Sequence, residues 1–305
     1  MNNLLTRLMM MAVVLLGTAT YSFAAEKLNI VTTQTILADL VKQIGQDKVN
    51  VQAIASPKYN IHFIQPKPSD VRKVSKADLY FNLGLDLEAW SDPLLEAVGK
   101  PQLFRNGSAN VDLSQGIRLL DVPDHPITRA EGDIHVFGNP HFQMNPENGR
   151  IMAQTILKKL EEVDPANTAY YEANAKAFFI KLDAKIVEWK SMCAHCKGKE
   201  IISYHEDIAY FTDFLGMKAE QFLEPKPGIP PTPKHMQFLE DYAKAHNITA
   251  IVRPTYYPED AAQALAQKIG GKVVTICQGA GEIPGTDDFF SFFDYDFKQI
   301  SEGVK

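Results

Sequence analysis

One succession of strands and helices occurs twice in this chain, and it limits the possible folds more than any other feature. In the first copy, a strand of β-branched residues that begins at Leu28 leads into apolar residues at helical spacing, and Gly45 ends that helix. The apolar positions of this helix are Ile36, Leu37, Leu40, Val41 and Ile44. A second strand follows at residues 49–55, so the pattern predicts a βαβ unit.

The second copy starts near residue 200 and has the same order. Ile201 and Ile202 belong to a strand, a helix follows, and Gly216 stops that helix before a further strand. In both copies a proline-rich loop, another helix and another strand come next, with these strands at residues 79–82 and 250–252. Two βαβ-rich halves with one connectivity predict an α/β protein with two similar lobes, each with a mostly parallel sheet.

A long helical segment separates the two copies. Its first part covers residues 145–163, and Asp164-Pro165 breaks and restarts it, with Asp164 as the expected cap of a second part that runs to Met192. This second part has an apolar stripe and is roughly 40 Å long, so it should contact both lobes and limit hinge motion. We therefore expect an N-terminal lobe at residues 25–144, a linking helix region at 145–192 and a C-terminal lobe at 193–305.

The start of the chain predicts export. A basic residue at Arg7, an apolar run from Leu8 to Leu16 and the small-residue end Ser22-Phe23-Ala24 are typical of a cleavable signal peptide, residues 1–24. We expect a periplasmic mature protein without a lipid anchor, because no cysteine follows the cleavage point. The net charge of -6, with both signs interspersed, gives no basic stripe, so nucleic acid is not an expected partner. A monomer is expected.

The chain has three cysteines, Cys193, Cys196 and Cys277. Export places them in an oxidising compartment, so at least one disulfide is expected. Cys193 and Cys196 have the spacing of a redox or zinc pair, but they end a helical pattern and no strand leads into them. A local disulfide that closes the helix is the favoured interpretation, and the third cysteine is then free or pairs with one of these two.

Three of the eight histidines lie at comparable junctions between elements. His62 follows the strand at residues 49–55, His205 follows the strand that contains Ile201, and His141 precedes the long helical segment. Ligands of open α/β sheets bind beyond the carboxyl ends of the strands, so His62 and His205 are expected to face each other across a cleft between the lobes, with His141 near both. Three imidazoles at one point predict a metal site.

Four stretches of sequence support this interpretation by resemblance. "NIHFIQPKPSDV", "IHVFGNPHFQMNPENG", "SYHEDIAYF" and "EPKPGIPPTPKH" resemble the cluster A-I periplasmic binding proteins of metal ABC importers. The resemblance covers the chain from Leu28 to about Ile300, in the family's order. It implies two α/β lobes bridged by a long backbone helix, in a protein that delivers zinc, manganese or iron to a membrane permease.

The resemblance also implies metal ligands. His62, His141 and His205 match the family's three histidine positions. Relatives that resemble manganese binders often have glutamate at the third position, so histidine there is similar to the zinc-type set, and imidazole suits Zn²⁺ better than Mn²⁺. The chain has Asn60-Ile61 before His62, where the family often has Asp-Pro, and this departure is expected to alter the loop or a contact to the ligand.

The fourth ligand is a second departure from the family. Many relatives have an aspartate directly after the strand equivalent to "KVVTI", and this chain has Cys277 there. Asp288, an acid before an aromatic residue and after a glycine-rich loop, is the favoured fourth ligand of a tetrahedral site. Asp287, Cys277, Glu206, a water molecule and the absence of any fourth ligand stay open as alternatives.

The other histidines have simpler interpretations. A polar loop at residues 121–138 contains His125 and His135 and is interpreted as a solvated loop. The alternatives are a secondary metal-capturing loop, like the His-rich loops of some zinc-type relatives, or an approach of His135 to the main site. His195, His235 and His246 are interpreted as structural, with His235 in the first turn of a helix and His246 near the end of one.

We expect a binding protein and not an enzyme, one that captures Zn²⁺ and hands it to the permease of an ABC importer. Whether a periplasmic metallochaperone loads it stays open. Uptake of manganese or iron, or adhesion, would keep the same fold. The alternative from another class is a zinc-dependent hydrolase, which three histidines and an open fourth position would suit. Against it, His205-Glu206 lacks the second histidine of an H-E-x-x-H motif.

Overall fold

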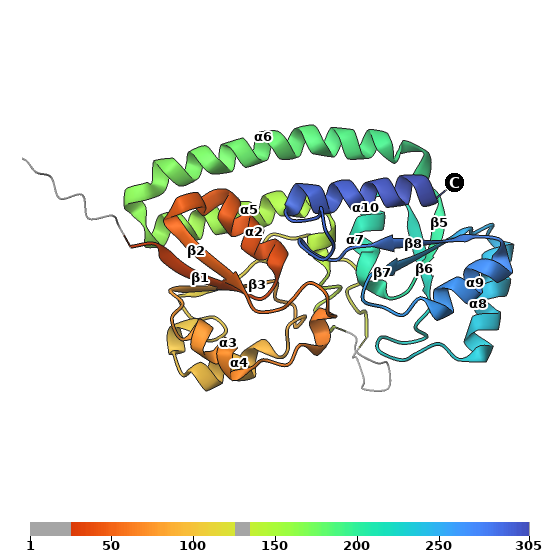
Figure 1. The fold of residues 1–305 in the computed structure, drawn as a ribbon, viewed down its shortest axis with the longest axis horizontal. Helices are drawn as coiled ribbons and strands as arrows, with labels where there is room; N and C mark the ends of the chain where they lie inside the picture. The colour runs from red at the N-terminus through yellow and green to blue at the C-terminus, as the bar shows by residue number, and fades with distance from the viewer. Residues whose placement is uncertain (1–25, 126–134, 305) are drawn as a thin grey trace, which may run out of the picture.

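The structure, a computed structural model, describes residues 26–125 and 135–304. The expected signal peptide and part of the polar loop lie outside these residues. Figure 1 shows two lobes side by side, with a long helix running above both. The described residues include no helix long and apolar enough to cross a membrane.

Each lobe contains a four-stranded sheet in which every pair of neighbours is parallel. The N-terminal sheet has the order β2-β1-β3-β4, with β1 (Leu28–Thr32), β2 (Val49–Ala53), β3 (Leu79–Asn82) and β4 (Asn110–Asp112). The C-terminal sheet has the order β6-β5-β7-β8, with β5 (Glu200–Ser203), β6 (Lys218–Phe222), β7 (Ala250–Pro254) and β8 (Lys272–Ile276). The two orders are equivalent, so the predicted fold of two similar α/β lobes is confirmed.

The first helix of each copy forms as its apolar pattern predicts. All five predicted core positions of α2 (Thr35–Gly45) are buried. Gly45 is required by a close approach, because a Cβ there would lie 2.5 Å from Cγ1 of Val49 at the start of β2. In the second copy, α7 (Ala209–Leu215) ends at Gly216, whose φ of +64° places it in the left-handed region that glycine adopts without strain.

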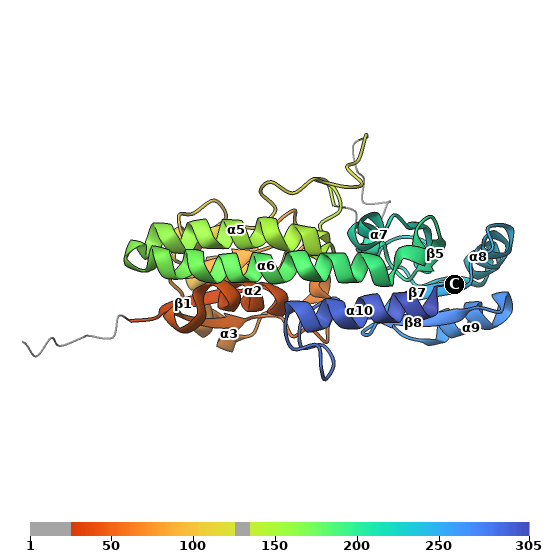
Figure 2. The ribbon, with the colours of Figure 1, turned by 90° about the horizontal axis from the view of Figure 1, so that it is seen from above.

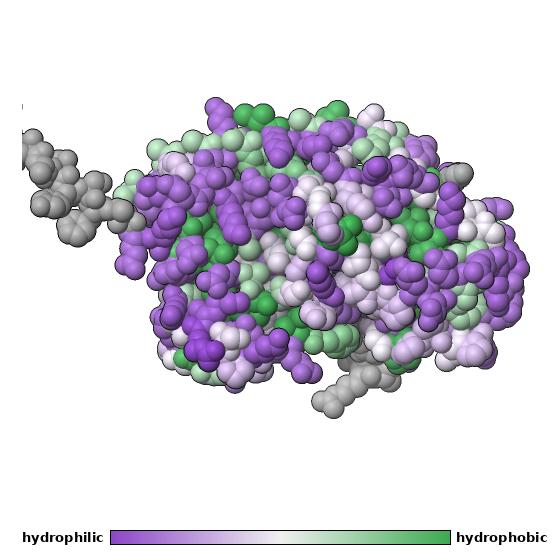
Figure 3. Space-filling model, viewed as in Figure 1, coloured by the Kyte–Doolittle hydropathy of each residue, from purple (hydrophilic) through white to green (hydrophobic). Residues whose placement is uncertain are grey.

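The remaining sheet helices are α3 (Pro68–Val74), α4 (Ser91–Val98), α8 (Pro233–Ala245) and α9 (Asp260–Ile269). In the N-terminal lobe, α3 and α4 lie on the opposite side of the sheet from α2 (Figure 1). Both proline-rich loops place proline at the first helical position, at Pro68 and Pro233, where the missing N–H costs no hydrogen bond. The face drawn in Figure 3 is largely hydrophilic, with apolar residues in separate small patches, because the sheets bury their apolar side chains beneath these helices.

The helical segment between the copies divides into two helices that lie alongside each other. α5 (Pro146–Val163) runs over the N-terminal lobe against α2, and only α6 (Thr168–Met192), with 25 residues, crosses to the other lobe (Figures 1 and 2). The break falls at Pro165, as predicted, but Asp164 makes no capping hydrogen bond to a backbone N–H. Its carboxylate instead accepts hydrogen bonds from Asn167 Nδ2 at 2.7 Å and the Tyr171 hydroxyl at 2.6 Å.

A further helix, α10 (Phe289–Gly303), joins the lobes from the other end of the chain. It lies beside α6 in both ribbon views and also contacts α2 and β8. Trp189 of α6 stacks on Phe297 at a ring-centroid distance of 5.1 Å, and the Phe289 backbone N–H donates to Asp39 Oδ2 of α2 at 2.9 Å. The sequence patterns above do not predict this helix.

The expected disulfide is not present in the structure, where Cys193, Cys196 and Cys277 are all buried free thiols. Cys193 and Cys196 are nevertheless in mutual contact after the end of α6, and Cys193 Sγ donates to the Phe297 carbonyl at 3.4 Å. The pair therefore attaches the end of α6 to α10 through packing and a weak hydrogen bond.

Candidate metal centre

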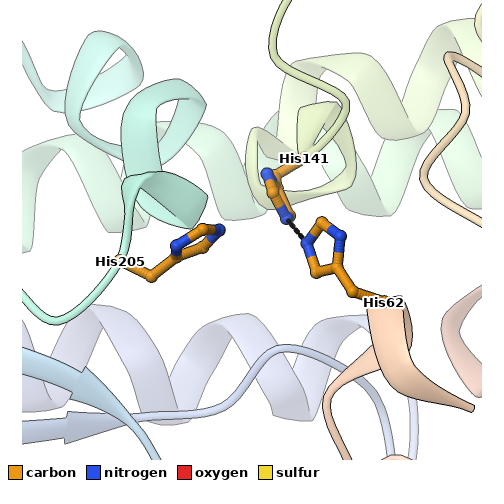
Figure 4. A group of neighbouring side chains, drawn as sticks. All are labelled: His62, His141 and His205. Carbon is orange, nitrogen blue, oxygen red and sulfur yellow. Dashed lines mark hydrogen bonds between the residues drawn. The ribbon is translucent and has the colours of Figure 1, made fainter. Parts of the chain in front are cut away.

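Three short 3₁₀ turns place three histidines at one point between the lobes. His62 lies in η2 (Ile61–Phe63), His141 directly precedes η5 (Phe142–Met144), and His205 directly precedes η8 (Glu206–Ile208). Figure 4 shows the three rings turned toward one another. The convergence expected from the carboxyl ends of β2 and β5 is therefore observed, with His141 as the third member.

The distances suit a common ligand. One ring nitrogen from each histidine lies within 4.8 Å of the other two, and the Nε2 atoms of His62 and His141 are 3.0 Å apart. Four nitrogens at about 2.0–2.1 Å from a tetrahedral zinc ion are about 3.3 Å from one another. The His141 and His205 side chains are nearly excluded from water, at 3% and 5% exposure. The arrangement can therefore hold a metal ion after small shifts of the rings, which bring the longer distances down and move His62 and His141 slightly apart.

Neighbouring groups turn two of the rings toward the centre. Nδ1 of His141 lies 3.0 Å from Asn139 Oδ1, and Nδ1 of His205 lies 2.9 Å from Glu224 Oε2. Oxygen atoms of an unprotonated carboxylate and of an amide carbonyl accept, so each Nδ1 carries the proton and each Nε2 offers a lone pair. Such outer hydrogen bonds orient metal-binding histidines and raise their basicity.

Two asparagines connect the lobes at the same place. Asn60 Oδ1 accepts from the His62 backbone N–H at 3.0 Å, while Asn60 Nδ2 donates to the Tyr257 hydroxyl of the other lobe at 3.2 Å. Asn139 Nδ2 donates to the Glu206 carbonyl at 2.9 Å. The departure from Asp-Pro before His62 therefore has a structural role, since Asn60 both caps the turn and bridges the lobes.

The three imidazoles differ in their affinity for protons. Burial, followed by the neighbouring His205 and His135, holds the pKa of His62 well below its ordinary value. Burial and the surrounding histidines do the same to the pKa of His141. Burial also acts to lower the pKa of His205, but the Glu224 hydrogen bond and nearby carboxylates outweigh it, and the pKa is raised. His62 and His141 are thus held in the neutral form that binds metals.

Comparison with known proteins agrees with this geometry. Residues 30–303 match the family described as "ZnuA: Zinc-uptake complex component A periplasmic". The chain belongs to this family. The resemblance inferred from the four motifs is confirmed.

Curated relatives include proteins named for two metals. The chain is 28% identical to the metal ABC transporter substrate-binding lipoprotein ScbA of Streptococcus cristatus, over 92% of this chain and 90% of the relative. It is 27% identical to the manganese ABC transporter substrate-binding lipoprotein PsaA of Streptococcus pneumoniae, over 94% and 92%. It is 26% identical to the high-affinity zinc uptake system protein ZnuA of Bacillus subtilis, over 81% and 77%.

Solved structures share the whole fold. A crystal structure of ZnuA has a TM-score of 0.76 and 25% identity, and the match covers 91% of this chain and 99% of that one. A zinc-bound deletion mutant of ZnuA has a TM-score of 0.77, also at 25% identity, over 92% and 99%. The relatives are therefore substrate-binding proteins of metal ABC transporters with this two-lobed architecture.

The favoured fourth ligand does not join the three histidines. Asp288 is the N-cap of α10, where its Oδ1 accepts from the Ser291 backbone N–H at 2.7 Å and from Ser291 Oγ at 2.9 Å. Cys277 directly follows β8 and is buried, and burial raises the pKa of its thiol. Within residues 26–125 and 135–304, no carboxylate, cysteine or further histidine has a ligand atom within 4.8 Å of those of all three histidines. Asp287 and Glu206 are thus outside the histidine group as well.

A fourth histidine does stand beside the group. The ring centroid of His135 is 5.1 Å from that of His62 and 6.2 Å from that of His141.

The other four histidines lie away from this group. His125 pairs with Asp124, His195 contacts the Ser301 carbonyl, His235 contacts the Phe222 carbonyl, and His246 contacts Glu200. The expected positions of His235 in the first turn of α8 and His246 at its end are observed.

Sequence reasoning missed Glu224 and Asn139, which orient two of the rings. Glu224 comes two residues after β6, so the rule that found His62 and His205, the carboxyl ends of parallel strands, applies to it too. Asn139 stands two residues before His141 in the "NPH" stretch, and the proline between them holds the short segment rigid.

Proposed function

We propose that this protein binds one Zn²⁺ ion between its lobes through His62, His141 and His205 and delivers it to the membrane permease of an ABC importer. The observation that carries the proposal is the group of three ring nitrogens within 4.8 Å of one another at the interlobe junction. Membership of the family described as a zinc-uptake component supports the delivery role.

Zinc is favoured over manganese and iron by the donor set. Imidazole suits Zn²⁺, whereas Mn²⁺ prefers carboxylate, carbonyl and water oxygens. The chain is similar in sequence both to a relative named for manganese and to one named for zinc, so this similarity alone does not select the ion. Here the third position is His205, and the nearby carboxylate of Glu224 contacts its outer nitrogen instead of facing the centre.

Binding is favoured over hydrolysis because a hydrolase needs a base aimed at a metal-bound water. Glu224 Oε2 is already engaged by His205 Nδ1 at 2.9 Å and by the Gly228 N–H at 3.2 Å. Its carboxylate thus orients a ligand. The proposal further includes export through the signal peptide at residues 1–24, a periplasmic location and a monomeric state.

The test is a metal competition on stripped protein. The mature chain is freed of metal, exposed to equimolar Zn²⁺ and Mn²⁺, separated from free ions and analysed for both metals. We expect one zinc and no manganese per chain. Manganese in the protein, or no metal at all, would overturn the zinc assignment, and two zinc ions per chain would contradict a single site.

As the pH is lowered, the zinc affinity should first respond to one proton, that of His205. Zinc binds neutral imidazole, and His205, whose pKa is raised above its ordinary value, keeps its proton to the highest pH of the three. As the pH falls through the pKa of His205, the logarithm of the affinity should fall by about one unit per pH unit. Steeper dependence should appear only at lower pH, because the pKa values of His62 and His141 are lowered. Competition titrations against a chelator of known pH behaviour measure this slope, and a slope of two or more from the start of the decline in affinity would contradict the expected order of protonation.

The Glu224→Gln variant should bind zinc about 10- to 100-fold more weakly at pH about 8, because His205 loses the carboxylate that orients it and raises its basicity. Its pH transition should also move lower, since the Glu224 hydrogen bond raises the pKa of His205. Glu220→Gln, four residues earlier and within β6, is the matched control, because the Glu220 side chain is 57% exposed. Equal zinc affinity in the two variants would remove Glu224 from the site.

A further inference from the structure

His135 begins a turn that is anchored to the rest of the N-terminal lobe by backbone hydrogen bonds. The His135 carbonyl accepts from the Gly138 N–H at 3.3 Å, and the Asn139 N–H donates to the Leu120 carbonyl at 2.8 Å, so a turn holds this histidine in place. Gly138 has a φ of +112°, and a Cβ there would lie 2.9 Å from the Leu120 carbonyl oxygen. The turn therefore requires glycine, and it fixes the direction in which His135 points.

Within this turn the apolar side chains are exposed and the polar side chain is buried, which is the reverse of what their hydropathy predicts. Val136 and Phe137 are 54% and 50% exposed, whereas His135 is only 9% exposed. Placing two large apolar side chains in water and an imidazole inside is unfavourable for an isolated segment. A role for the buried imidazole at the interlobe junction explains this inversion.

The ring spacings match four imidazoles around one ion. With zinc–nitrogen distances of about 2.0–2.1 Å, tetrahedral imidazole ligands have ring centroids about 5.2 Å apart. The ring centroid of His62 lies 5.1 Å from that of His135, 5.1 Å from that of His141 and 5.6 Å from that of His205. The His141–His205 distance is 5.6 Å and the His135–His141 distance is 6.2 Å. These five distances thus all lie within about 1 Å of the tetrahedral value.

We propose that His135 is the fourth ligand and that the ion is held by His62, His135, His141 and His205 alone. This inference rests on the proposed zinc-binding function and deepens it. His135 moves inward by about 1 Å when the ion binds, closing its longer distance to His141. Asp288, the acid favoured from the sequence, keeps its role as the cap of α10.

An all-imidazole site has a consequence for selectivity. Four neutral imidazoles place no carboxylate directly on the ion, since Glu224 contacts only the outer nitrogen of His205, and they offer none of the hard oxygen atoms that Mn²⁺ prefers. Removal of His135 should therefore reduce discrimination between Zn²⁺ and Mn²⁺ as well as affinity, because water takes the fourth position.

The test compares His135→Ala with His125→Ala and Asp288→Ala in the full mature chain. His125 belongs to the same loop but is exposed and paired with Asp124, so it is the matched control. X-ray absorption on the zinc-loaded proteins counts imidazole ligands, and chelator competition gives affinity. We expect about four imidazoles in the wild type and in both controls, three in His135→Ala, and zinc binding roughly 10²-fold weaker in that variant alone.

Thermal unfolding of the metal-free proteins separates a ligand from a structural histidine. A ligand predicts an unchanged or higher midpoint for metal-free His135→Ala and a smaller increase on adding zinc. A lower metal-free midpoint with an unchanged imidazole count would overturn the proposal, as would loss of a ligand in Asp288→Ala alone. A wild type that binds no metal would instead refute the zinc-binding function itself, and a wild type with one zinc on three imidazoles would refute only the role of His135.

Discussion

Replacing His141 with alanine is expected to weaken zinc binding by roughly 10²–10³-fold. Four-ligand zinc sites are stabilised by about 10–16 kcal/mol, or about 3 kcal/mol per ligand, which corresponds to this factor. His141 is 3% exposed, its Nε2 lies 3.0 Å from that of His62, and its Nδ1 is held by Asn139. Both ring nitrogens of His141 are thus in contact and its ring is held in place, so its loss leaves a gap that water fills poorly.

Competition titration against a strong chelator measures the effect. His246→Ala is the control, since His246 lies at the end of α8 against Glu200 and should leave affinity unchanged. The metal-free variant should fold, because burial of a neutral imidazole among other histidines contributes little to stability. Zinc affinity within a factor of about three of the wild type would place the ion elsewhere and sink the proposed site.

Two members of the three-histidine group, His62 and His205, were predictable because the topology of the sheets places them. His62 and His205 follow equivalent strands of two equivalent sheets, and their side chains meet because the carboxyl ends of those strands face the junction. No distance or rotamer is needed for that inference. The proposal for the fourth ligand was less secure, since it depended on a loop whose course the sequence does not determine.

Asp288 illustrates why the sequence alone does not determine the fourth ligand. The run from Phe289 to Ile300 has apolar residues at helical spacing, with Phe289, Phe292, Phe293, Phe297 and Ile300 all buried. An aspartate directly before such a run, with Ser291 three residues on, is an N-cap signal. The same residues fit both a ligand pattern and a helix start. The sequence interpretation used only the ligand pattern, so it did not predict α10.

His135 could not be placed from sequence for a different reason. Its loop has no strand or helix to set its direction, and its position depends on Gly138 and on the Leu120 carbonyl, which are brought together only by the tertiary fold. A polar loop with exposed Val136 and Phe137 shows no periodicity that would indicate which side chain is buried. The direction of such a side chain is determined by the tertiary structure and not by the local sequence.

Replacing Phe293 with alanine is expected to reduce the free energy of unfolding by about 3–5 kcal/mol. Phe293 is fully buried, with ring centroids 4.5 Å from Phe292, 4.9 Å from Phe289 and 5.4 Å from Trp189 of α6. These aromatic residues fill the contact between α6 and α10, the two helices that join the lobes. The deleted ring would leave a cavity that rigid helices on both sides cannot close.

Urea denaturation of the metal-free chain measures the loss, and Phe238→Ala on α8, where the ring is 48% exposed, should cost about 1 kcal/mol or less. A loss below about 1 kcal/mol for Phe293→Ala would show that α6 and α10 do not depend on this packing. Saturating zinc then tests the connection between the helices and the site. The zinc concentration is set to about 1,000 times the dissociation constant of the wild type. If α6 and α10 only hold the lobes in register, this zinc should add about 4 kcal/mol to the free energy of unfolding of both proteins. A smaller gain in the variant would mean that the aromatic contact also sets the distance between His62 and His205, and so contributes to metal affinity from outside the site.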